Sequence, residues 1–264
     1  MRTLPSIMMK SNCVRALFTG ALLITAAVPT AGQTAANGDI VLHARRAVGI
    51  TGAWSLVNDI TAAGGVRIAN PDAGAAKLET ALASPRDYFE LPFTAEPGRG
   101  YHLWIRSKAQ NDSWRNDSAY VQFSGSVTAS GSAKFRIGTT SAAMYTLEEG
   151  SGAGSSAWGW QDNGYGYGVL GETIYFTGTS QTLRVQARED GISIDQIVLS
   201  PVAYATKAPG LGKNDTTIIP EPGATTATTE PAPAPAPTGS GAWTNTVNAT
   251  SSGAVLKKTA GCAG

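Results

Sequence analysis

Residues 39–205 are dominated by short segments in which apolar and polar positions alternate with a period of two, the pattern of strands with one buried face. The clearest of these segments are 88–94, 101–107, 119–124, 173–177, 181–187 and 192–200. Turn-forming residues separate them, and Asp190-Gly191 predicts a type I′ turn that closes a hairpin between the last two strands. Only residues 75–83 (AAKLETALA) have a helical composition, which predicts a single short helix on a crossing loop. Many short strands with glycine-rich turns and no alternating helices predict an all-β fold, an antiparallel sandwich or barrel.

The N-terminal segment 1–36 has the layout of an export signal. Arg2, Lys10 and Arg15 form a basic stretch around the start of the apolar run 16–28, and small residues follow it. The run is too short to cross a bilayer, so we expect a signal peptide, a secreted or surface-exposed mature chain, and no membrane span within it. Loss of these three basic residues changes the formal net charge from +1 to −2. No basic face is left that would hold phosphates, so nucleic acid is not an expected partner.

The composition divides the mature chain into three parts. A β-sandwich domain is expected over 37–206, and a domain of about 165 residues buries about two-thirds of its unfolded surface, enough to fold without a disulfide. A disordered, Pro-rich linker is expected over 207–241, with an extended Ala/Pro/Thr tract from 221 onward. The tail 242–264 is expected to be disordered; the alternative is the start of a second, truncated β module. We expect the mature chain to be a monomer.

Residue patterns that carry catalysis or bind metals are missing from the sequence. The two histidines, His43 and His102, both lie among strand residues, and no Gly-x-Ser-x-Gly turn accompanies them. The acidic pairs at 148–149 and 189–190 are adjacent in sequence, so on a strand their members point to opposite faces, and we interpret them as solvated loop charge. No metal-ligand spacing and no phosphate-binding glycine loop occurs. We therefore expect no enzyme activity, no catalytic residues, no cofactor and no metal.

Two segments place aromatic rings among amides and carboxylates: 111–118 (NDSWRNDS) and 158–167 (WGWQDNGYGY). A site for a sugar needs a flat ring for the C–H face and polar side chains for the rim of hydroxyls. The candidate ligand-binding residues are Trp114, Asn116, Asp117, Trp158, Trp160, Asp162 and Tyr165.

A structural interpretation of the same residues stays open. Trp158 and Trp160 are two positions apart, so on a strand they share one face, which could be the core. Asn116 and Asp117 could equally be turn-formers that bond to their own backbone. Trp104, between Leu103 and Ile105, is expected in the core or on a sheet face.

The order YHLWIR, NDS, YVQF, WGW and REDGISIDQIVLS resembles bacterial carbohydrate-binding modules of the galactose-binding-like jelly-roll type, over residues 39–200. The resemblance implies an antiparallel jelly-roll sandwich that binds a glycan through loop-end residues, with Trp158, Trp160, Asn116 and Asp117 at matching positions. It also matches Asp195 to an aspartate that helps bind a structural Ca²⁺ in many such modules.

This chain departs from that type at the implied calcium site. Its first strand carries Arg45 and Arg46 in the region where a glutamate is usual. A carboxylate-poor site cannot easily assemble about six or more oxygen ligands, so calcium is doubtful here. The hypothesis that follows is a salt bridge from Arg45 or Arg46 to Asp195 in place of the ion.

The leading interpretation is a secreted, non-catalytic module that binds glycans weakly through loop-end aromatics, since each ring stack contributes about 1 kcal/mol. The alternative is a structural or adhesion spacer of a larger bacterial surface protein that binds no sugar. The Pro-rich linker and the segment after it favour a modular chain in either case.

Overall fold

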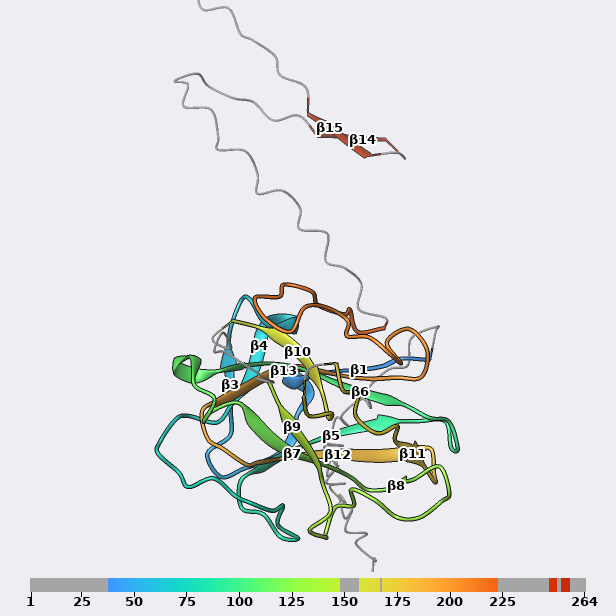
Figure 1. Ribbon diagram of the computed structural model, residues 1–264. Coiled ribbons are helices and arrows are strands. Elements are labelled where there is room, and N and C mark those ends of the chain that lie inside the picture. Colours follow the sequence, from blue (N-terminus) through green and yellow to red (C-terminus); the bar gives the residue numbers. More distant parts are fainter. Residues whose placement is uncertain (1–37, 148–156, 167, 223–246, 251–252, 257–264) are drawn as a thin grey trace, which may run out of the picture. The chain divides into compact units, whose positions relative to one another are not determined.

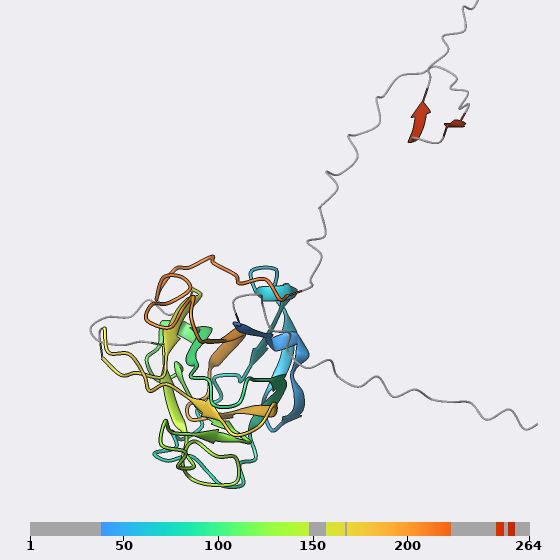
Figure 2. The same ribbon diagram turned by 90° about the vertical axis from the view of Figure 1, so that its right-hand side faces the viewer.

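Two antiparallel sheets stacked face to face, with one additional two-stranded pair, make up the folded domain (Figures 1 and 2). The computed structural model describes residues 38–147, 157–166, 168–222, 247–250 and 253–256. The strands are β1 (Ile40–His43), β2 (Val48–Thr51), β3 (Ser55–Asn58), β4 (Val66–Ala69), β5 (Tyr88–Thr94), β6 (His102–Ala109), β7 (Ser118–Phe123), β8 (Ser126–Val127), β9 (Ala143–Thr146), β10 (Gly159–Asp162), β11 (Tyr175–Phe176), β12 (Ser180–Ala187), β13 (Ile192–Ser200), β14 (Val247–Thr250) and β15 (Gly253–Leu256). The helical elements within these ranges are short 3-10 turns, η1 (Ala44–Arg46), η2 (Ala63–Gly65) and η3 (Gln110–Asp112).

The connectivity is that of a jelly roll. The first sheet has the order β10-β6-β13-β4-β3, with β1 also paired to β13, and the second has the order β2-β5-β12-β7-β9. The consecutive strands β4, β5, β6 and β7 therefore alternate between the two sheets, as do β12 and β13. This arrangement confirms the expected all-β antiparallel sandwich.

Two local predictions were wrong. Asp190-Gly191 does not close a hairpin, because β12 and β13 lie in different sheets and the turn carries the chain from one to the other. Residues 75–83 form an irregular loop and no helix. The backbone of this loop forms hydrogen bonds to other segments in place of those within a helix. For example, the Leu78 N–H donates to the Arg188 carbonyl at 2.8 Å.

The main core lies between the sheets. Phe93, Phe123 and Phe176 meet edge to face there, with centroids 5.4 Å apart for both Phe93–Phe176 and Phe123–Phe176. A register shift in β13 between Ile194 and Gln196 lets Ile194 before the shift and Ile197 after it both reach this core.

The outer face of the first sheet is covered by residues 201–222, drawn in orange in Figures 1 and 2. The indole of Trp104 donates to the Tyr204 carbonyl at 2.6 Å, and the indole of Trp160 donates to the Thr217 carbonyl at 3.1 Å. Trp104 is thus buried on a sheet face, as expected. The predicted domain boundary at residue 206 falls short, because residues 207–222 are packed on the sandwich and are not a linker.

Glu221 anchors the end of this covering segment. Its buried carboxylate accepts hydrogen bonds from Arg45 and from Arg46, the latter at 2.6 Å. Burial raises the pKa of Glu221, but the bonds from the two arginines outweigh it and hold this pKa below its ordinary value. The hypothesis that Arg45 or Arg46 pairs with Asp195 was wrong, since both face Glu221.

Residue contacts divide the chain into two units, with the boundary after Ala224. The described part of the second unit is the antiparallel pair β14–β15. The predicted signal peptide and the Pro-rich tract after residue 222 lie outside the described residues. Within the described ranges, no helix is long and apolar enough to span a membrane.

Candidate functional site

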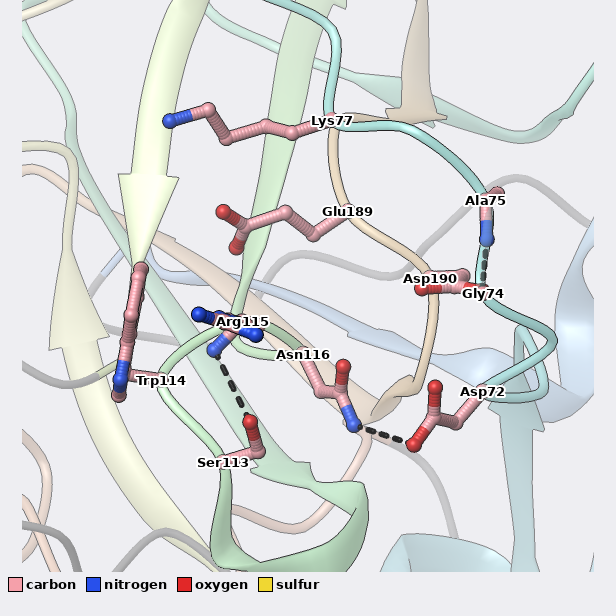
Figure 3. Close-up of a pocket in the computed structure, with 10 residues that line it drawn as sticks. All are labelled: Asp72, Gly74, Ala75, Lys77, Ser113, Trp114, Arg115, Asn116, Glu189 and Asp190. Carbon is pink, nitrogen blue, oxygen red and sulfur yellow. Dashed lines mark hydrogen bonds between the residues drawn. The ribbon is translucent and has the colours of Figure 1, made fainter.

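Three connections between the sheets meet at one end of the sandwich and enclose a cavity of about 550 Å³ (Figure 3). They are the β4–β5 loop at 72–77, the β6–β7 loop at 113–116, and the β12–β13 turn at 189–190. Trp114 stands on one side of this cavity with 61% of its surface exposed. We refer to it below as the Trp114 cavity.

Asn116 ties two of these loops together. Its side-chain amide donates to Asp72 Oδ2 and to the Gln110 carbonyl, both at 3.0 Å. This approach requires a glycine at position 191, because a Cβ there would lie 2.5 Å from Asn116 Cγ and the φ angle is +83°. Gly191 therefore leaves the space in which the Asn116 side chain lies beside the cavity.

The acidic pair Glu189 and Asp190 is buried at the base of the cavity, so its interpretation as solvated loop charge was wrong. Asp190 Oδ2 accepts from the backbone N–H groups of Ala73 at 2.7 Å and Ala75 at 2.8 Å, which holds the β4–β5 loop in place. Glu189 accepts from the Ser118 hydroxyl. Sequence reasoning missed both residues as site residues; the available signal was an acidic pair directly before the glycine of a strand connection.

Lys77 and Arg115 supply positive charge at the rim. Both side chains are exposed, and the Arg115 guanidinium carbon lies 5.0 Å from the centroid of the Trp114 ring. In Figure 3 the Trp114 ring faces Arg115 and Glu189, with Lys77 above them and Asp72 on the far side. The cavity thus combines an aromatic face with hydrogen-bond donors and acceptors.

The structure places only Trp114 and Asn116, of the seven candidates, in this cavity. Trp158 and Trp160 are 4% and 1% exposed, so neither ring can serve as a stacking platform. Asp117 and Asp162 are also buried. The five remaining candidates are thus apart from the site: Asp117, Trp158, Trp160, Asp162 and Tyr165, the last of which is 68% exposed on another loop.

The two rings are buried by different neighbours. Trp160, in β10, lies on the outer face of the first sheet, where the segment 201–222 covers it. Trp158, directly before β10, is buried among other side chains. The Trp158 indole donates to Thr61 Oγ1 at 2.9 Å, and the cations of Arg106 and Lys108 lie over its ring.

Asp162 organises the loop that follows β10. Its carboxylate accepts from His102 Nε2 at 2.7 Å and from the N–H groups of Gly164 at 2.9 Å and Gly171 at 2.8 Å. Burial raises the pKa of Asp162, but these bonds outweigh it and lower the pKa below its usual range. This carboxylate is committed to the loop and not to a ligand.

Asp195 is fully buried and pairs with Arg106, whose guanidinium donates to Oδ2. The Ala63 N–H donates to the same oxygen at 2.6 Å. Burial raises the pKa of Asp195 to about 6, against the opposing effect of Arg106. A calcium ion would need about six oxygens, whereas Asp195 faces a guanidinium, so these residues do not fit a calcium site.

No family model matches the sequence, and no curated protein matches it. Solved structures do match. The chain is similar to carbohydrate-binding modules of the CBM35 and CBM6 types.

A family 35 carbohydrate-binding module from Clostridium thermocellum is 12% identical with a TM-score of 0.36, and the match covers 61% of this chain and 97% of that chain. The module CBM6cm-2 of Cellvibrio mixtus lichenase 5A, in complex with cellotriose, is 13% identical with a TM-score of 0.36, covering 61% and 95%. The Cry4Aa toxin of Bacillus thuringiensis is 12% identical with a TM-score of 0.40, covering 62% and 24%. None of these likenesses assigns a ligand to this chain.

Proposed function

We propose that the folded domain is a non-catalytic glycan-binding module and that the Trp114 cavity is its binding site. The observation that carries the proposal is the exposed indole of Trp114 on the wall of a cavity lined by amide, carboxylate and cationic groups. An indole in this position offers a flat apolar surface to the C–H face of a sugar ring. The exposed carboxylate of Asp72 accepts hydrogen bonds from sugar hydroxyls, and Lys77 donates to these hydroxyls.

The loops that carry these groups are held before any ligand binds. Asn116 bridges to Asp72, and Asp190 fastens Ala73 and Ala75, so little loop ordering accompanies binding. The expected affinity is still weak, because the cavity offers one aromatic platform and the rest of the contacts are polar groups that water also satisfies.

Binding without hydrolysis is supported by the way the acidic groups are used. Asp190 accepts two backbone N–H bonds, and Glu189 accepts from Ser118 and, at 3.3 Å, from Arg188. Carboxylates engaged in holding loops are poorly placed to transfer protons to a glycosidic oxygen. We therefore propose a binding role and no enzyme activity.

The proposal includes export of the mature chain to the cell surface or beyond, which the segment 1–36 supports. It also includes a monomeric mature chain. The second candidate function is a structural or adhesion spacer that binds no sugar. The observation that favours it is the division of the chain into two units with an Ala/Pro/Thr tract at their boundary.

Affinity gel electrophoresis of the full chain tests the proposal, on gels containing cellulose derivatives, xylans, mannans, β-glucans and uronic-acid polysaccharides. We expect retention by at least one polysaccharide and, for Trp114→Ala, a Kd raised by about fivefold or more, which corresponds to the loss of about 1 kcal/mol of ring stacking.

Tyr165→Ala is the matched control, because Tyr165 is a similarly exposed aromatic on a loop apart from the cavity. Both variants remove exposed rings, so the urea midpoint of unfolding stays unchanged in each. Lost retention in Tyr165→Ala with normal retention in Trp114→Ala would place the site elsewhere. If no polysaccharide retains the wild-type chain, the glycan-binding proposal is wrong and the spacer function is favoured.

A further inference from the structure

A second cavity, of about 340 Å³, lies directly beside the Trp114 cavity. The two share Ala75, Glu189 and Asp190 in their linings. The second cavity continues along the other side of the β4–β5 loop, where its walls come mainly from alanine, proline and leucine side chains. They include Ala53, Pro71, Ala76, Leu78, Leu82 and Pro85.

The loop segment 73–76 forms a low ridge between the two cavities. Its residues are Ala-Gly-Ala-Ala, so no side chain on it extends beyond a methyl group. Gly74 is exposed at a φ angle of +76°, with no atom within 4 Å of the place where its Cβ would be. An extended ligand can therefore pass over the ridge without meeting a side-chain barrier.

The ridge is rigidly held, so the two cavities keep their relation to each other. Asp190 accepts from the N–H groups of Ala73 and Ala75 on one side. Leu78 N–H donates to the Arg188 carbonyl at 2.8 Å on the other, and the Tyr120 hydroxyl donates to the Leu78 carbonyl at 3.0 Å. A preformed cleft of this kind favours a ligand that spans it over one that fills half of it.

The volumes and chemistry of the two cavities fit successive units of one ligand. Small-molecule sites in proteins measure roughly 300–1,000 Å³, and each cavity alone reaches this range. The second has leucine and proline walls that suit the apolar C–H face of a sugar, and exposed Arg86 stands at its rim. It has no aromatic ring among its lining residues, so Trp114 remains the main platform.

We propose that the two cavities form one cleft for an oligosaccharide, with one unit against Trp114, the chain crossing the 73–76 ridge, and a further unit in the second cavity. This inference rests on the proposed function and names its substrate class: a glycan chain of at least two linked units, and not a free monosaccharide.

Isothermal titration of the full chain with length series of β-1,4-linked glucose, mannose and xylose, each from the monosaccharide to the tetrasaccharide, tests the inference. For the wild type we expect affinity for one series to rise with length by about fivefold or more. Ala76→Arg fills the second cavity and removes this gain while monosaccharide affinity is unchanged. Leu82→Asp places a charge on the same wall and has the same effect.

Ala129→Arg is the matched control, because Ala129 is an exposed alanine that lines a cavity formed by other loops. It keeps the full dependence on length. Equal wild-type affinity for all lengths, or an unchanged gain in both Ala76→Arg and Leu82→Asp, overturns the two-part cleft and leaves single-unit binding at Trp114 intact. Absence of binding to every saccharide and every polysaccharide overturns both proposals.

Discussion

Truncation after Thr206 removes most of the segment that covers the outer face of the first sheet. The shortened chain loses Thr217 and Ile219, which lie against Trp160, and loses the Glu221 carboxylate that binds Arg45 and Arg46. A chain that ends after Pro222 keeps all of these contacts and lacks only the Pro-rich tract and the second unit. We expect the first truncation to destabilise the sandwich strongly and the second to leave its stability unchanged.

The magnitude follows from the area of Trp160. This residue is 1% exposed, and a buried aromatic side chain covers roughly 150–250 Å². At about 25 cal/mol per Å² its full exposure costs about 4–6 kcal/mol. Partial collapse of the uncovered face reduces this figure, yet even half of it lowers Tm by about 5–10 °C for a domain of this size. Such a loss is a large part of a typical stability of about 5–15 kcal/mol.

Urea and thermal unfolding of the two truncated chains, followed by tryptophan fluorescence, measures the difference. The chain ending at residue 206 should unfold at lower urea and show a red-shifted native emission, because Trp160 becomes hydrated. The chain ending at residue 222 is the control and should match the full chain. Equal midpoints and equal native spectra for both truncations would refute the assignment of residues 207–222 to the domain.

Two further predictions concern the buried ion pair and the turn at the cavity. Because the folded pKa of Asp195 is raised from 3.8 to about 6, its contribution to stability is fully present below pH 3.8 and is lost as the pH rises through 6. The unfolding free energy of the wild type relative to Asp195→Asn should therefore fall by about 2 kcal/mol between pH 4 and pH 6 in urea titrations, whereas a constant difference would contradict the raised pKa. Gly191→Ala should lower stability by more than about 1 kcal/mol, since it puts a Cβ at a positive φ angle and against Asn116. Its retention on the polysaccharide gels should also fall, and an unchanged urea midpoint would show that this turn tolerates a side chain.

The period-two pattern predicted the longest strands, β5, β6, β7, β12 and β13, and the class of fold. Residues 88–94 and 192–200 were predicted with the bounds that β5 and β13 have. In β5 the fully buried positions alternate with less buried ones, as the pattern predicts, whereas every position of β13 is buried. The exposed position of Trp114 on a loop between strands was also readable, since a polar, turn-rich segment surrounds it.

Only the tertiary structure determined which segments pack against each face of the sheets. A period-two pattern places Trp158 and Trp160 on one face but does not tell which element packs against that face. The covering segment 201–222 has no such period, because it is held by separate hydrogen bonds, as from the Trp160 indole to the Thr217 carbonyl, and by ion pairs of the buried Glu221 carboxylate.

The candidate site depends on the same kind of information. Trp114, Asn116, Glu189 and Asp190 come together because β12 and β13 belong to opposite sheets, so that the turn between them meets the β6–β7 loop at one end of the sandwich. The alternation of apolar and polar residues along a strand does not predict the sheet to which that strand belongs. The sequence by itself therefore determined the longest strands and offered Trp114 as a candidate, whereas the pairing of strands across space determined the cavity beside it.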